Sequence, residues 1–82
     1  MAKVEVQLRD KLLVTCAEAA AMLSTSEITL REIVKKGLIE SHSIRGVLKF
    51  YVEDLHDYCN RMRGKDVDPY ADVVVRDMRY KA

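Results

Sequence analysis

Few residues of this chain have the types and spacing that a catalytic or metal site needs. His56 and Cys59, in an H-x-x-C spacing, would supply two metal ligands. A zinc site needs three or four ligands, and only His42 and Cys16 remain as further histidine and cysteine donors. No nucleophile has a convincingly paired base, and the chain lacks a glycine-rich phosphate loop. The sequence therefore predicts no enzyme, no metal site and no cofactor.

Basic residues are more informative, because they are unevenly distributed along the chain. The whole sequence of 82 residues has a net charge of only +1. Residues 31–49 nevertheless hold five basic and two acidic residues, a local charge of +3, whereas residues 50–60 carry −3. Such segregation can orient a small protein on a polyanion.

Length and composition exclude several classes of protein. The chain is 49% hydrophobic and 33% charged, which is typical of a folded domain with one small core rather than of a disordered chain. No apolar run approaches the ~20 residues of a membrane span, and the charged N-terminal residues are unlike a signal peptide. Two cysteines are too few for a disulfide framework. We expect a cytoplasmic protein with reduced cysteines and no membrane partner.

Two helices are predicted on either side of a polar break at residues 24–26. Thr15 and Glu18 form a capping-box pattern before an alanine-rich run, so the first helix should start at Thr15. Ser26 can cap the second helix, which should end at Gly37. The inward stripe of this second helix would be Leu30, Ile33 and Val34, and its opposite face would carry Ile28, Arg31, Glu32 and Lys35.

The remaining segments favour strands and a third helix. Residues 1–8 alternate between apolar and polar side chains, as a half-buried strand does. Residues 38–44 and 47–51 favour a β-hairpin, in which Gly46 supplies the positive φ of the turn. A third helix should pack an inward stripe and end near Gly64; this stripe consists of Val52, Leu55, Cys59 and Met62, flanked by Tyr58.

The tail after residue 64 is ambiguous. Asp68-Pro69 is a plausible helix start, whereas three consecutive valines, residues 73–75, suit a strand. We therefore divide the chain into a domain of residues 1–64 and a tail of residues 65–82. The tail has an apolar segment that we expect to pack on its own core or on a neighbouring protomer; it comprises Val73, Val74, Val75, Met78 and Tyr80.

This order of elements predicts a mainly α fold with a small β-hairpin, a winged helix-turn-helix. Residues 13–58 resemble, without a gap, the excisionase and MerR-like group of small winged-helix DNA-binding domains. The residues that carry this resemblance are Thr15, Glu18, Ala19, Ala20, Leu23, Ser26, Thr29, Leu30, Ile33, Val34, Gly37, Gly46, Lys49, Phe50, Asp54 and Leu55. The small size is more similar to a phage excisionase, a recombination directionality factor, than to a MerR-type regulator.

The resemblance implies a function and partners. Phage excisionases bind repeated sites in attachment-site DNA cooperatively with copies of themselves, bend the DNA, and direct a phage integrase toward excision. One alternative is a small MerR-like transcriptional regulator that binds a palindrome as a two-fold dimer. Another is a protein-interaction adaptor without DNA contact, which the low net charge and the acidic Glu27 and Glu32 leave open.

The predicted DNA contacts come from the second helix, residues 26–36, and the hairpin, residues 41–50. Arg31 can donate two hydrogen bonds to guanine or pair with Glu27, which can otherwise accept from cytosine. Ile28 can meet a thymine methyl group or cover the helix start. Arg45, at the hairpin turn, can contact phosphates or enter a minor groove, and the lysines can contact phosphates or remain solvated. The complete predicted set is Thr15, Ser26, Glu27, Ile28, Thr29, Arg31, Glu32, Lys35, Lys36, Ser43, Arg45 and Lys49.

Overall fold

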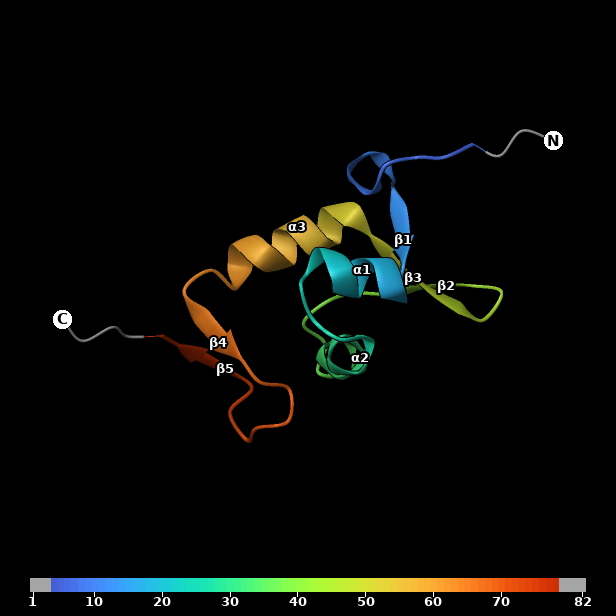
Figure 1. The fold of residues 1–82 in the computed structure, drawn as a ribbon. Helices are drawn as coiled ribbons and strands as arrows, with labels where there is room; N and C mark the ends of the chain where they lie inside the picture. Colours follow the sequence, from blue (N-terminus) through green and yellow to red (C-terminus); the bar gives the residue numbers. More distant parts are fainter. Residues whose placement is uncertain (1–3, 79–82) are drawn as a thin grey trace.

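A computed structural model describes residues 4–78, which form three α-helices, a three-stranded antiparallel sheet and a separate two-stranded ladder (Figure 1). The elements in chain order are η1, a 3-10 helix (Leu8–Asp10), β1 (Leu13–Thr15), α1 (Cys16–Met22), α2 (Glu27–Lys35), β2 (His42–Ile44), β3 (Val47–Tyr51), α3 (Val52–Arg61), β4 (Lys65–Val67) and β5 (Val75–Asp77). The fold is mixed α/β, because β1 and the C-terminal ladder add strands to the predicted hairpin.

The predicted capping box starts α1. The Glu18 amide donates to Thr15 Oγ1 at 3.1 Å, and the Thr15 amide donates to Glu18 Oε1 at 2.9 Å. Lys11 Nζ also donates to Glu18 Oε2 at 2.5 Å, which ties the segment before β1 to the helix. The bond from Lys11, followed by the bond from the Thr15 amide, lowers the pKa of the Glu18 carboxyl from 4.5 to about 2. Glu18 is therefore ionised and bonded in the folded protein at neutral pH.

This lowered pKa predicts a pH-dependent contribution to stability. A carboxyl whose pKa falls on folding stabilises the protein above its unfolded pKa, and the contribution is lost as the pH falls from about 4.5 toward 2. Glutamine can still complete the capping box, so Glu18→Gln removes mainly the ion pair with Lys11; because the Glu18 side chain is 28% exposed, we expect a cost of only about 1 kcal/mol at pH 7, the upper value for an exposed pair. The measurement is urea unfolding of both proteins from pH 7 to pH 2, in which the difference should vanish at the acid end. Glu40→Gln, at an exposed loop position, is the control, and a difference that persists at pH 2 would contradict the prediction.

The helix α2 also begins and ends as predicted. The Thr29 amide donates to Ser26 Oγ at 3.1 Å, and the Ser26 hydroxyl donates to Thr29 Oγ1 at 2.9 Å. Gly37 has φ +76° and follows the helix, and its amide donates to the Val34 carbonyl at 2.9 Å. The polar break between the helices contains a left-handed residue as well, since Ser24 has φ 57°.

Strand β3 is the centre of the three-stranded sheet. It pairs with β2 across a turn in which Arg45 and Gly46 have φ 53° and 79°, as a two-residue type I′ hairpin requires. Strand β2 is shorter than predicted, because residues 38–41 lie outside it. On its other side β3 pairs with β1, with Val14 opposite Phe50.

The predicted N-terminal strand is wrong for the residues that the structure describes. Residues 4–7 have no regular structure, and the side chains of Val4 and Val6 are 84% and 47% exposed. Leu8 begins η1 instead, and residues 1–3 lie outside the described part. The physical reason is competition for one sheet edge: Leu13–Thr15 occupies the place beside β3 and buries Val14 in the core.

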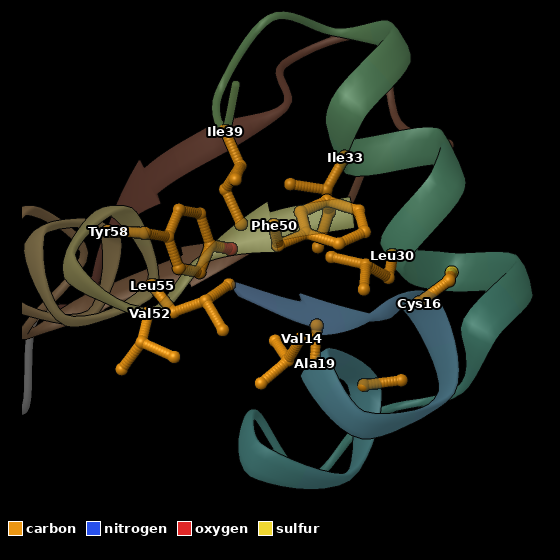
Figure 2. Close-up of a cluster of buried hydrophobic side chains, with 11 residues drawn as sticks. Val14, Cys16, Ala19, Leu30, Ile33, Ile39, Phe50, Val52, Leu55 and Tyr58 are labelled. Atoms are coloured by element: carbon orange, nitrogen blue, oxygen red, sulfur yellow. The ribbon is translucent and has the colours of Figure 1, made fainter. Parts of the chain in front are cut away.

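The core lies between the sheet and the three helices (Figure 2). Phe50 and Leu30 are fully buried, and Val14 is 1% exposed. The other members are Cys16, Ala19, Ala20, Ile33, Ile39, Val52, Leu55 and Tyr58. The predicted inward position of Cys16 is confirmed, but that of Cys59 is wrong. The buried stripe of α3 runs through Tyr58, which turns Cys59 toward solvent.

The tail forms strands rather than a helix. Strands β4 and β5 pair antiparallel, and Lys65 Nζ contacts Asp77 Oδ1 at 3.1 Å across them. Asp68 begins a connecting loop instead of capping a helix, because its amide donates to the Val74 carbonyl at 2.8 Å. Of the apolar tail residues, Val75 joins β5, Val73 and Met78 are exposed, and Tyr80 lies outside the described residues.

Candidate nucleic-acid interface

The outward face of α2 is polar apart from one side chain. Leu30 and Ile33 anchor the helix in the core, which turns Arg31 and Lys35 toward solvent. Lys35 Nζ contacts the half-buried Glu32 at Oε1, with a distance of 3.6 Å. An exposed pair of this kind is weak, so the Lys35 ammonium remains accessible to another anion.

A groove runs between α2, the start of α1 and the hairpin. It has a volume of about 570 Å³. Its lining residues are Thr15, Cys16, Ala17, Glu27, Arg31, Gly46, Val47 and Leu48. Figure 1 shows the β2–β3 hairpin extending away from the helices, so one wall of the groove belongs to a projecting element. The fold thus brings Glu27 and Arg31 of α2 beside the hairpin turn.

Arg31 has no ion-pair partner within residues 4–78. Glu27 lies one helical turn earlier and lines the same groove, but no salt bridge joins the two side chains. The alternative in which Arg31 forms an ion pair with Glu27 is therefore not the arrangement in this structure. The planar donor group of Arg31 is free to bind an acceptor that enters the groove.

The other predicted contacts occupy three different places. Lys36 is exposed at the end of α2, and Arg45 is exposed at the hairpin turn. Ser43 is exposed on β2 and is paired with Leu48 of the groove lining, but it is not itself a lining residue. Lys49 alternates with the core residue Phe50 and is paired with Thr15 of the groove lining, and it is not a lining residue either. The structure does not bring Lys49 into the groove.

Thr15, Ser26 and Thr29 serve helix capping. Thr15 and Ser26 each accept a backbone N–H, and the hydroxyl of Thr29 accepts from Ser26. Their structural roles are thereby established, and Thr15 also lines the groove. Five other residues line the groove and were not among the predicted contacts: Cys16, Ala17, Gly46, Val47 and Leu48. For Ala17 the signal in the sequence is its outward position in the first turn of α1, and for Leu48 it is the alternation of side chains along β3.

Acidic side chains gather elsewhere in the described part of the chain. Glu40, Asp54 and Asp57 line a second hollow between α3 and the segment after α2. Arg61 closes this region by donating to Asp57 Oδ2 at 2.7 Å and to the Leu38 carbonyl at 2.8 Å. These carboxylates lie outside the groove between α2 and the hairpin, whose charged lining residues are Glu27 and Arg31.

No protein-family model, curated protein or solved structure matches the chain. Within residues 4–78, no helix has the length and apolar character needed to cross a membrane. The same residues contain no group of three or more histidine, cysteine or acidic side chains placed to hold a metal ion. The groove with Arg31 and the exposed cations of α2 and the hairpin turn are therefore the basis for a functional proposal.

Proposed function

We propose that this protein binds double-stranded DNA as a winged helix-turn-helix domain. In this arrangement α2 enters the major groove and the β2–β3 hairpin is the wing, placed against the neighbouring backbone or minor groove. The observation that supports it best is the exposed Arg31, which has no ion-pair partner within residues 4–78 and shares a groove with the hairpin turn. A major groove about 12 Å wide admits an α-helix, and bidentate contact with guanine is the commonest specific role of arginine there.

The remaining cations suit contacts with the phosphate backbone. Lys35 and Lys36 lie at the exposed end of α2, and Arg45 lies at the tip of the hairpin. Long cationic side chains on both sides of Arg31 would hold the helix in register over the bases, since phosphate contacts position a protein and base contacts specify the sequence. Lys49 is left out of this arrangement, because it is half-buried on β3 and lies neither at the end of α2 nor at the tip of the hairpin.

The biological role that we propose is that of an excisionase. Its support is the resemblance of residues 13–58 and the C-terminal ladder, whose loop exposes Tyr70 and Val73 at a surface where the next protomer would bind. Several protomers on repeated sites would together bend the DNA and present it to an integrase. Bending a site of 20–30 base pairs by 40–90° costs about 1–6 kcal/mol, which phosphate contacts from several copies could offset.

Salt-dependent duplex binding is the test of this function. Duplexes that the protein selects from a random pool would be measured by fluorescence anisotropy at 50 and 200 mM salt. Three or four phosphate contacts predict a loss of affinity of about 40- to 150-fold between these concentrations. A footprint then separates the two DNA-binding roles: direct repeats support an excisionase, and a palindrome supports a MerR-like regulator.

A protein-interaction adaptor is the second candidate, and one observation favours it. Within residues 4–78 Glu27 has no salt-bridge partner, and it lines the groove, where phosphates would repel it. An adaptor predicts no salt-dependent affinity for any duplex and no loss of function when Arg31 and Lys35 are replaced by alanine. The anisotropy series therefore decides between the two functions.

A further inference from the structure

Ile28 is an apolar side chain on the polar face of α2 that the fold does not use. It is 72% exposed, whereas Leu30 and Ile33 of the same helix are buried. It is also absent from the side chains that pack against the core. The alternative in which Ile28 covers the helix start does not agree with this exposure. An isoleucine that is exposed to water in this way does not stabilise the fold.

Ile28 lies beside Glu27 and Arg31, the two charged groove residues, which form no salt bridge within residues 4–78. Glu27 is the preceding residue, and Arg31 lies three residues later on the same helical face. All three are in the first two turns of α2, the part of a recognition helix that contacts base edges. The side chain next to Arg31 is therefore placed to meet the neighbouring base pair.

The first turn of α2 is also rigid. The two hydrogen bonds between Ser26 and Thr29 fix the backbone on either side of Ile28. A β-branched side chain in a helix has one strongly preferred χ1 rotamer. The methyl groups of Ile28 are thus presented in one orientation, and little conformational entropy is lost when they are covered.

We infer that Ile28 is a specificity-determining residue that recognises the C5 methyl group of a thymine beside the base pair contacted by Arg31. This inference rests on the proposed DNA-binding function. Among the four bases, only thymine presents an apolar group in the major groove, and the other edges present hydrogen-bond donors and acceptors. A cytosine at this position has no C5 methyl group and would leave the isoleucine without its apolar partner.

Uracil substitution tests the inference one methyl group at a time. In a duplex selected by the wild-type protein, each thymine is replaced by deoxyuridine, which removes the methyl group and keeps every hydrogen bond. One such replacement should weaken wild-type binding about fourfold, the equivalent of burying one methyl group (~0.8 kcal/mol). Ile28→Ala should bind the thymine duplex more weakly than the wild type does and be insensitive to the same replacement.

The outcomes separate this inference from the function on which it rests. A wild-type protein that binds no duplex overturns both. Binding that is salt-dependent but unaffected by every uracil overturns the inference alone, as does an Ile28→Ala variant that remains sensitive to the uracil. The folding control is thermal unfolding, in which Ile28→Ala should match the wild type because the side chain makes no core contact.

Discussion

Replacing Phe50 with alanine is expected to destabilise the protein by about 3–5 kcal/mol, the largest effect of any substitution considered for this chain. Phe50 is fully buried on β3 and packs within the cluster that holds Leu30 of α2 and Val14 of β1 (Figure 2). Its removal would leave a cavity at the point where sheet and helices meet. A domain of this size has roughly 4–12 kcal/mol of total stability, so a large share would be lost.

Thermal and urea unfolding followed by circular dichroism measure this effect. Each kcal/mol lowers the melting temperature of a small domain by about 4–8 °C, so Phe50→Ala should melt at least about 12 °C below the wild type. Tyr51→Ala is the matched control, because Tyr51 is the next residue of the same strand and is 44% exposed on the other face of the sheet. Equal losses for the two variants would show that the sheet faces are assigned incorrectly.

Replacing Arg31 with alanine is expected to weaken binding to the selected duplex by about 5- to 150-fold. The reason is the loss of a bidentate contact with guanine, worth about 1–3 kcal/mol of discrimination. The variant should also lose its preference for one base pair, because the remaining cations contact phosphates. Arg31 is exposed and lies outside the buried core, so its thermal unfolding should stay close to that of the wild type.

Two further variants identify the kind of contact that Arg31 makes. Lys36→Ala should weaken binding to all sequences alike and reduce the salt slope by about one, as a phosphate contact does. Arg63→Ala removes the same charge as Arg31→Ala from the segment just after α3, where Arg63 donates to Asn60 Oδ1 at 3.4 Å, and should change the affinity little. If Arg63→Ala and Arg31→Ala had the same effect, binding would reflect net charge rather than the groove.

The sequence predicted which residues lie on the outward face of α2, but it did not predict whether their side chains are free of partners within the protein. Helical periodicity assigned Ile28 and Arg31 to the outward face of α2 and Leu30 to the inward one, because a spacing of 3.6 residues per turn determines the face. Whether Glu27 forms an ion pair with Arg31, and whether Ile28 covers the start of the helix, depends on the conformations of the individual side chains. Only the tertiary structure shows Arg31 unpaired in the described chain and Ile28 uncovered.

The sequence alone determined the features that depend on neighbours a few positions apart. The capping box at Thr15, the cap at Ser26, the helix end at Gly37 and the turn at Gly46 all formed as predicted, because each depends on hydrogen bonds or φ angles within one turn of chain. Backbone groups so close in sequence meet in any compact fold, and side-chain chemistry then selects the local structure.

The tertiary structure decided which segments pair across long distances. Residues 1–8 and 13–15 both suit a strand, and only packing against Phe50 selects the second. The same competition places Tyr58 rather than Cys59 in the core and turns the tail into a ladder instead of a helix. Such outcomes depend on which of several distant segments contributes the apolar surface that completes the core. A local sequence pattern cannot show the result of this competition.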